Sequence, residues 1–330
     1  MCIKLIEEAR RLGASDLHLT VGAVPMVRIM GQLQSLSLAN NNTVKSNQLE
    51  NLVGLMPEGT KKLLFDNGEV DCAWSWEGER YRLNLYREKG VYALACRILQ
   101  SGQPSCKNLG LPSPIQKLAE LQQGLVLIVG PTGSGKTTSL TALVQQINMT
   151  KAVHIITLED PIEYEYPQGI ALIHQREVGR DTCSFASGLR AALREDPDVI
   201  IVGELRDAES MSIALTAAET GHLVLATMHT QDVLSSINRI VDALPNNQQQ
   251  VRSQLAESLQ AVVSQRLLPK ADGRGRVAAF ELLLATDAVC HLIRDGQTHQ
   301  LATYLQTGTK SGMLTMAESI MSLKRAGIVR

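Results

Sequence analysis

The chain has 330 residues, about twice the length of a usual single domain, so we expect two domains or one large one. Hydrophobic residues make up 44% of the chain and charged residues 20%, which excludes wholesale disorder. The formal net charge is -1, so the overall field would not attract an anionic partner, and a local basic cluster would have to bind it.

The sequence predicts neither membrane insertion nor export. The longest apolar runs, such as residues 125–129, are far below the roughly 18 residues that a spanning helix needs. Glu7 and Glu8 lie where a signal peptide would require an uninterrupted apolar stretch. The six cysteines include no Cys-x-x-Cys pair, which fits reduced thiols. We therefore expect a cytoplasmic protein.

The first hundred residues predict a small domain of one helix and several half-exposed strands. Apolar residues at helical spacing predict a helix over 3–12, which Gly13 ends. Alternating apolar and polar residues predict antiparallel strands, and a turn at 88–90 would join the last two as a hairpin. These strands are expected at 17–19, 27–29, 81–86 and 91–99. Two glycines and three prolines make 100–114 the best linker candidate.

The rest of the chain predicts buried strands that alternate with helices. Continuous apolar runs predict strands at 125–129, 154–158, 199–202 and 223–227. Helices are expected at 138–147, 185–194 and 208–219. This alternation is typical of a parallel sheet covered on both faces. A long helix over 247–268 and a strand over 277–284 complete the prediction.

The segment after the first of these strands matches the phosphate-binding pattern GxxxxGK[ST]. Its residues are Gly130, Pro131, Thr132, Gly133, Ser134, Gly135, Lys136 and Thr137, followed by Thr138 in the helix. The glycines let backbone N–H groups turn inward around a β-phosphate, at the positive end of the helix. Lys136 can reach the β- and γ-phosphates, and the Thr137 hydroxyl can bind Mg²⁺. We therefore expect ATP and Mg²⁺ as cofactors.

Hydrolysis also needs carboxylates at the ends of neighbouring strands. Glu204 follows one predicted strand and is the best candidate, because Asp198 precedes that strand and would lie at the wrong edge of the sheet. Glu159 and Glu163 follow another strand. We expect Glu163 to polarise water with Glu204, and Glu159 and Glu204 to support the metal beside Thr137. The alternative for the segment around Glu163 is a solvated acidic turn.

Four segments in this order resemble the boxes of the secretion-ATPase superfamily: the P-loop, an Asp box at 157–163, a Walker B segment at 193–207 and a His box at 220–230. Within it, the chain is similar to the type IV pilus retraction ATPases, the PilT group, over nearly its whole length. Pilus-extension and type II secretion relatives carry a further N-terminal domain and usually a tetracysteine zinc element. The sequence shows neither, and its histidines lack metal spacing, so we expect no zinc.

The resemblance implies an α/β fold in which a RecA-like P-loop ATPase core follows a smaller, PAS-like α+β N-terminal domain. We place the N-terminal domain at residues 1–103, a linker at 104–113, and the RecA-like domain with its C-terminal helical region at 114–330.

The resemblance also implies residues that sense the nucleotide phosphates. These are Arg82 and Arg97 in the N-terminal domain, Arg190 and Arg194 in the core, and His222 and His229 in the His box. Planar guanidinium groups suit this role because they donate two hydrogen bonds to one phosphate. The alternatives are an exposed strand residue for Arg82 and a neutral imidazole bonded at a strand end for each histidine.

Two further arginines are weaker candidates. Arg206 and Arg176 would be explained by ion pairs with Asp207 and Glu177.

One motif departs from the family. Residues 288–295 stand where the group has the AIRNLIRE motif, which is associated with retraction. Cys290 replaces its Arg and His291 replaces its Asn. This leaves a PilT-like paralogue with another role as an alternative.

The resemblance implies a homo-oligomer, a hexameric ring, that hydrolyses ATP to disassemble pilin and so power pilus retraction and twitching motility. Its partners would be a pilus platform protein in the inner membrane and, as a further candidate, a paralogous motor ATPase. The protein would then lie in the cytoplasm, peripheral at the inner face of the cytoplasmic membrane.

Three alternatives remain open. The first is a secretion or extension motor of the same superfamily. The second is a RecA-like nucleic-acid motor, but balanced charge and only 3% aromatic residues argue against it, so we expect no nucleic acid. The third is a catalytically weak regulatory subunit in a mixed ring.

Overall fold

A computed structural model describes residues 2–36, 43–99, 102–273 and 275–330. The first two residues of the predicted linker region, 100 and 101, lie outside these ranges. The chain divides into two compact units, residues 1–102 with 161–164 and residues 103–160 with 165–330, and each unit is described by itself.

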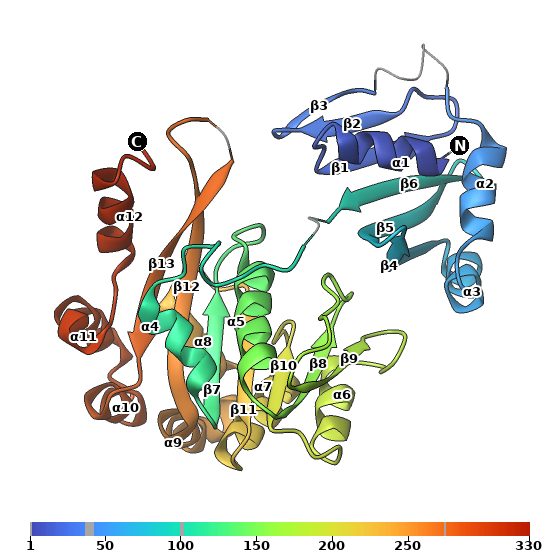
Figure 1. The fold of residues 1–330 in the computed structure, drawn as a ribbon. Helices are drawn as coiled ribbons and strands as arrows, with labels where there is room; N and C mark the ends of the chain where they lie inside the picture. Colours follow the sequence, from blue (N-terminus) through green and yellow to red (C-terminus); the bar gives the residue numbers. More distant parts are fainter. Residues whose placement is uncertain (1, 37–42, 100–101, 274) are drawn as a thin grey trace. The chain divides into compact units, whose positions relative to one another are not determined.

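The first unit is a six-stranded antiparallel sheet with helices on one face (Figure 1). The strands are β1 (Asp16–Thr20), β2 (Met26–Ile29), β3 (Gln32–Ser35), β4 (Glu69–Trp76), β5 (Glu79–Glu88) and β6 (Val91–Ile98), in the order β3-β2-β1-β6-β5-β4. The helices are α1 (Cys2–Arg11), α2 (Ser46–Gly54) and α3 (Glu58–Asn67).

Buried and partly exposed side chains alternate along the strands of this sheet, so one of its faces can pack against the helices. Along β5 the buried side chains are Tyr81, Leu83 and Leu85, which pack under the helices, while the residues between them are partly exposed. The predicted hairpin is confirmed: β5 pairs with β6, and Lys89 and Gly90 both have positive φ, as a tight two-residue turn requires. The strands β3 and β4 and the helices α2 and α3 were not predicted.

The second unit is a seven-stranded sheet in the order β13-β12-β7-β11-β10-β8-β9. Its strands are β7 (Gly124–Val129), β8 (His154–Glu159), β9 (Leu172–Glu177), β10 (Val199–Val202), β11 (Leu223–Met228), β12 (Leu259–Pro269) and β13 (Arg276–Leu284). Neighbouring strands run parallel except for the β12–β13 hairpin. The parallel sheet and its predicted strands are therefore confirmed.

Helices and short 3-10 turns connect and cover these strands. The helices are α4 (Ser113–Gln116), α5 (Lys136–Thr150), α6 (Phe185–Ala192), α7 (Ala208–Glu219), α8 (Val233–Ala243), α9 (Gln248–Ser258), α10 (Asp287–Arg294), α11 (Leu301–Thr307) and α12 (Met316–Arg325). The 3-10 turns are η2 (Lys117–Glu120), η3 (Pro245–Asn247), η4 (Thr298–Gln300) and η5 (Gly308–Ser311).

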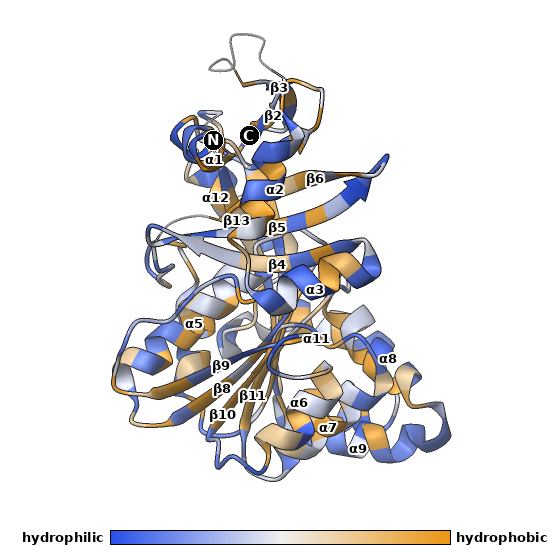
Figure 2. Ribbon diagram, turned by 90° about the vertical axis from the view of Figure 1, so that its right-hand side faces the viewer, coloured by the Kyte–Doolittle hydropathy of each residue, from blue (hydrophilic) through white to orange (hydrophobic). Residues whose placement is uncertain are grey.

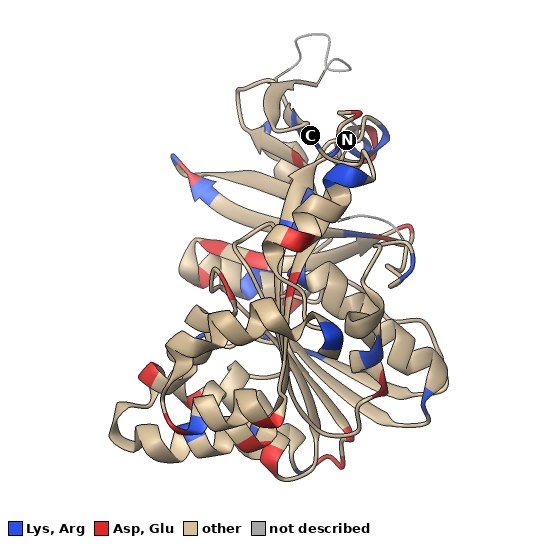
Figure 3. Ribbon diagram, turned by 90° about the vertical axis from the view of Figure 1, so that its left-hand side faces the viewer, with Lys and Arg blue, Asp and Glu red and all other residues tan. Residues whose placement is uncertain are grey.

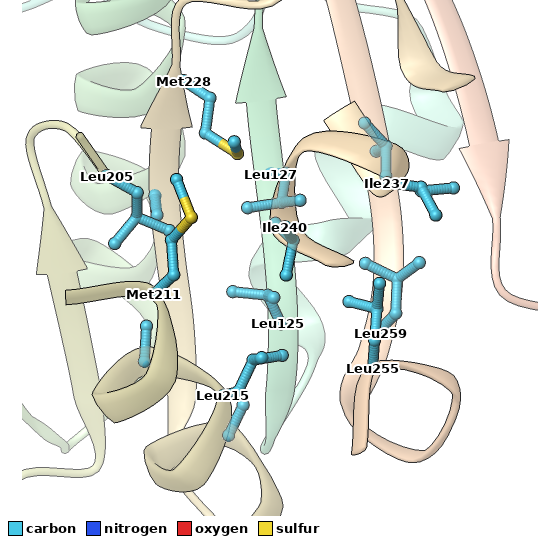
Figure 4. Close-up of a cluster of buried hydrophobic side chains, with 14 of the residues drawn as sticks. Leu125, Leu127, Leu205, Met211, Leu215, Met228, Ile237, Ile240, Leu255 and Leu259 are labelled. Atoms are coloured by element: carbon cyan, nitrogen blue, oxygen red, sulfur yellow. The ribbon is translucent and has the colours of Figure 1, made fainter. Parts of the chain in front are cut away.

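The sheet separates two hydrophobic cores. Leu125 and Leu127 of β7 point to the face covered by α6 to α11, and Val126 and Ile128 point to the face covered by α4 and α5. Figure 4 shows the first core around Leu125, Leu127, Leu215 and Ile240. Figure 2 shows β10 and β11 in hydrophobic colours along their length. Because β7 is buried throughout, the loop that follows it starts from a fixed point.

The long helix expected over 247–268 is wrong. Helix α9 ends at Ser258, and the chain continues as β12 from Leu259. The apolar run that includes Val262 and Val263 pairs with β7 on one side and with β13 on the other. Pairing on both sides satisfies the backbone, and Val262 and Val263 are buried in the cores on opposite faces of the sheet. Together these effects outweigh the helical period read from the sequence.

The residues predicted as a linker, 104–113, lie in the second unit. Cys106 and Leu111 are buried in the core beneath α5. In the described ranges, no helix combines the length and the apolarity that crossing a bilayer requires.

Candidate nucleotide-binding site

The glycine-rich loop lies between β7 and α5, as the motif predicted. Gly130, Gly133 and Gly135 all have positive φ, of 149°, 76° and 86°. At Gly130 a Cβ atom would lie 2.5 Å from the backbone oxygen of Gln265, so a side chain has no room there. Thr137 and Thr138 follow in the first turn of α5, whose N-terminus adds a positive field to the loop.

Lys136 lies folded into this loop. Its Nζ donates to the backbone oxygens of Gly130 at 2.9 Å and Pro131 at 3.1 Å. Burial lowers the pKa of Lys136, and the nearby Glu204 carboxylate opposes that shift. The loop thus holds an ammonium group beside backbone N–H groups, a combination suited to phosphate.

A hydrogen-bond chain leads from Lys136 to Glu204. Lys136 Nζ lies 3.3 Å from His229 Nδ1, and His229 Nε2 lies 3.2 Å from Glu204 Oε1. An ammonium group only donates, so Nδ1 accepts and Nε2 carries the proton that is donated to Glu204. Thr132 Oγ1 also lies 3.4 Å from Nδ1. The chain therefore connects the predicted phosphate-binding cation with the predicted catalytic carboxylate.

The second oxygen of Glu204 is also engaged. Arg206 Nε donates to Glu204 Oε2 at 2.7 Å, and Arg206 Nη1 lies 3.6 Å from Asp160 Oδ2. The predicted pairing of Arg206 with Asp207 is wrong, because Asp207 caps α7 by accepting from the Ser210 N–H at 2.8 Å. Sequence reasoning missed that Arg206 bridges two of the acidic boxes.

Arg176 also has another partner than predicted. It pairs with Glu195 at 2.7 Å and not with Glu177.

Glu159 lies on another side of the site. Its Oε1 accepts from Thr157 Oγ1 at 2.7 Å and from Gln175 Nε2 at 3.0 Å, toward β9. Strands β10 and β11 separate β8 from β7 and the P-loop. The structure thus gathers Lys136, His229 and Glu204, and it places Glu159 three strands away.

The two histidines of the His box lie at opposite edges of the sheet. In the parallel pairing Leu223 is opposite Gly124, and Met228 is opposite Val129, the last residue before the P-loop. His229 therefore follows β11 at the P-loop edge, while His222 precedes it at the other edge. His222 Nδ1 donates to the Ala217 backbone oxygen at 3.0 Å. In this unit His222 does not face the P-loop.

Arg190 and Arg194 lie near the end of α6, one helical turn apart. Arg190 forms an ion pair with Glu209 of α7, and Arg194 Nη1 donates to the backbone oxygen of Arg190 at 3.1 Å. Both side chains are exposed. These bonds stay within α6 and α7.

Arg82 and Arg97 lie side by side in the first unit, because they are paired in register on β5 and β6. Arg82 Nη2 lies 2.5 Å from Asp71 Oδ2, and Arg97 Nε lies 3.3 Å from Asp16 Oδ1. These four side chains line a hollow of about 290 Å³.

Glu163 belongs to the same unit as this hollow. Burial raises the pKa of Glu163, and the positive charges of Arg82 and Arg97 oppose that shift. The register of β5 and β6 therefore sets Arg82 and Arg97 on one face of the sheet, which the sequence left open.

The fold and this loop define a P-loop nucleotide-binding protein with a RecA-like core. The family model for the type II/IV secretion system protein matches residues 108–326. The chain belongs to this family.

Within the family, similarity is high to proteins of the PilT group. The chain is 44% identical over 308 residues to a twitching motility protein of Neisseria gonorrhoeae, covering 92% of this chain and 82% of that protein. It is 40% identical over 329 residues to the type IV pilus retraction ATPase PilT of Pseudomonas aeruginosa, covering 99% and 94%.

A solved structure agrees with this grouping. The crystal structure of the pilus retraction motor PilT with bound ADP superposes with a TM-score of 0.91 at 45% identity, covering 99% of this chain and 94% of that one. The predicted fold class and membership of the PilT group are therefore confirmed.

Proposed function

We propose that this protein hydrolyses Mg-ATP at the P-loop and uses the energy to power retraction of type IV pili. The observation that carries the proposal is the chain from Lys136 through His229 to Glu204, which links a phosphate-binding cation to a proton-accepting carboxylate. Similarity over nearly the full length to a pilus retraction motor supports it.

The loop fits the phosphates of a nucleotide. The backbone packs so closely at Gly130 that no side chain fits there. Ser134 Oγ is buried with no partner among the described residues, as expected where a ligand or its water completes the contacts. Mg²⁺ bound by Thr137 and phosphate oxygens would neutralise charge on the transferred phosphoryl group. Glu204 would support the metal through water, whereas Glu159, which the sequence assigned to the same role, bonds to Thr157 and Gln175 on the side of β9.

Few protein ligands are available to that metal. In the ranges that the structure describes, no group of three or more His, Cys, Asp or Glu side chains is placed to hold a metal ion. The nucleotide and water would therefore complete the metal's coordination shell.

Lys136 exchanges partners when phosphate binds. A phosphate oxygen carries more negative charge than the carbonyls of Gly130 and Pro131, so it competes for the same N–H groups. His229 Nδ1 then loses the hydrogen bond from Lys136. Because the same imidazole donates to Glu204 through Nε2, its hydrogen bond to the carboxylate changes as well. Glu204, together with Glu163, orients the attacking water and accepts its proton.

The arginines report the nucleotide to the rest of the molecule. Arg82, Arg97 and Arg190 are each held by a carboxylate, and a phosphate group would compete for the same guanidinium donors. We assign phosphate sensing to these residues and to Arg194, with His229 as the contact inside the core.

The working assembly is a homo-oligomer, a ring of six chains, in which nucleotide binding moves one domain against the other. The ring would act on a pilus platform protein in the inner membrane, with a paralogous motor ATPase as a further partner. It would thus lie in the cytoplasm, peripheral at the inner face of the membrane.

A second candidate, a paralogue of the retraction motor with another role, is favoured by one observation. In α10, His291 Nε2 lies 3.4 Å from Asp295 Oδ2, and Cys290 packs against the core. These residues replace the Asn and the Arg of the family's retraction-associated motif.

A nucleic-acid motor is disfavoured by the charge distribution. Figure 3 shows Lys and Arg positions interspersed with Asp and Glu positions along the ribbon of the described residues. ATPase rates measured with and without single-stranded DNA test this alternative, because a helicase would be strongly stimulated.

A deletion strain separates the first two candidates. We expect loss of pilus retraction, restored by the wild-type gene and not by Lys136→Ala. Normal retraction without this protein would reject the retraction proposal and favour the paralogue. The purified protein must also hydrolyse ATP, and nucleotide binding without turnover would instead indicate a regulatory subunit.

A further inference from the structure

One buried glutamine outside the predicted motifs contacts the P-loop. Gln265 of β12 is 2% exposed, and its Nε2 donates to the backbone oxygen of Ser134 at 2.7 Å. A carbonyl oxygen only accepts hydrogen bonds, so this contact fixes which end of the amide faces the loop. The residue reaches the loop because β12 pairs with β7 in parallel register.

Gln265 also fills the space beside two loop glycines. A Cβ atom at Gly130 would lie 2.5 Å from the Gln265 backbone oxygen, and one at Gly135 would lie 2.8 Å from its Nε2. The backbone oxygen leaves no room for a side chain at Gly130, and a side chain at Gly135 would displace the Gln265 amide from the loop. The glycines thus serve the packing of β12 against the loop as well as the backbone turn.

This contact sets the direction of one backbone donor. In a trans peptide the C=O and N–H groups point to opposite sides. Since the Ser134 oxygen faces Gln265, the N–H of Gly135 points away from β12. Gly135 directly precedes Lys136, at the start of α5. Its N–H therefore belongs to the group of donors that surrounds a bound phosphate.

Two polar atoms beside this contact have no partner among the described residues. They are Gln265 Oε1 and Ser134 Oγ, and both residues are at least nine-tenths buried. Buried polar atoms are almost always hydrogen-bonded in native proteins. Their position next to the loop fits a ligand or a bound water that completes the network.

We propose that Gln265 is a positioning residue that holds the Ser134–Gly135 peptide with its N–H toward the β-phosphate of a nucleoside di- or triphosphate. The inference rests on the proposed function for the identity of the ligand. It assigns a specific donor to one oxygen of one phosphate, so its effect depends on the presence of that phosphate.

The test compares ADP with AMP. Gln265→Met keeps the length of the side chain but removes the donor, and Gln265→Glu keeps the shape while placing an acceptor against the Ser134 oxygen. We expect each variant to bind ADP about tenfold more weakly than the wild type and to bind AMP, which lacks a β-phosphate, almost unchanged. In turnover, KM for ATP should rise more than kcat falls.

A second glutamine of the same strand provides the matched control. Gln260 packs against Gly124 at the start of β7, the end of that strand remote from the P-loop. Gln260→Met makes the same substitution on the same strand and should leave the ADP to AMP affinity ratio unchanged.

The outcomes are distinct. If Gln265→Met and Gln265→Glu lower Tm but keep the wild-type ADP to AMP ratio, Gln265 only packs the loop and the proposal is overturned. If one variant does not fold, the other still gives that ratio. A wild-type protein that binds ADP but drives no retraction would reject the proposed function and leave this inference standing.

Discussion

The two sheets of the molecule handle charged residues in different ways. The antiparallel sheet of the first unit has one buried face, and its other face carries Arg82 and Arg97 with their carboxylate partners. The parallel sheet of the second unit is covered on both faces, so its polar groups gather where strands end. A one-sided sheet can thus carry binding groups along its length, whereas a two-sided sheet restricts them to its edge.

The strongest test of this difference concerns Glu204 at the edge of the parallel sheet. Glu204→Gln keeps the shape of the side chain and removes its ability to accept a proton. We expect kcat for ATP hydrolysis to fall by about 10²–10³-fold while ADP affinity stays within a few-fold. Steady-state kinetics and equilibrium binding measure the two effects. Retention of more than a tenth of kcat would remove Glu204 from the catalytic step.

Variants of His229 and His222 compare the two opposite edges of the parallel sheet. His229→Ala breaks the link between Lys136 and Glu204, so we expect about tenfold slower hydrolysis. His222→Ala lies at the other edge and is the matched control. In an ATPase assay of the isolated protein it should stay close to the wild type. Equal losses in both variants would show that position relative to the P-loop does not decide the effect.

A substitution at Arg82 tests the exposed face of the antiparallel sheet in the first unit. Arg82→Ala removes a partly exposed ion pair with Asp71, which contributes about 0–1 kcal/mol to stability, so Tm should change little. If this face meets phosphate, kcat should fall about tenfold. Asp71→Ala removes the same ion pair while keeping the cation, and it should leave kcat nearly intact. Parallel losses in both variants would assign only a structural role to the pair.

The smallest expected effect is on stability and involves Glu163. Burial raises the pKa of this carboxyl above its ordinary value of 4.5, so the folded state binds a proton more tightly than the unfolded state. Its ionisation therefore costs stability as pH rises through 4.5 toward the folded-state pKa, and the full cost persists above that value.

Glu163→Gln should accordingly raise Tm slightly at pH 7, and the gain should vanish well below pH 4.5. Thermal unfolding followed across this range measures it. A gain that grows as the solution becomes more acidic would contradict the assigned direction of the pKa shift.

Local patterns explain which parts of the site could be predicted. The P-loop and Glu204 could be predicted because a strand, a turn and a helix follow one another in the sequence. The positions of Arg206 and Gln265 were not readable, because each reaches the site through strand neighbours distant in the chain. Residues 259–269 show the same limit, since their pairing with β7 and β13 decides between helix and strand.

The His box shows a subtler difficulty. His222 and His229 border one strand, and periodicity alone does not say which end of that strand faces the ligand. Only the parallel register with β7 separates them. Likewise, Arg82 and Arg97 could be placed on adjacent strands from the hairpin, while the register that sets them on one face came from the structure.

The short connection after β10 determines how stiff this edge of the core is. Glu204 and Asp207 stand three residues apart, and Asp207 is fixed to the first turn of α7 through the Ser210 N–H. Helix α7 in turn packs in the same hydrophobic core as α9, which leads directly into β12. Glu204 and the P-loop are therefore both attached to elements of one tightly packed core, which leaves little room for local movement. Because Glu204 and the loop belong to one packed core, a substitution that loosens the packing of α7 or α9 is expected to disturb both together.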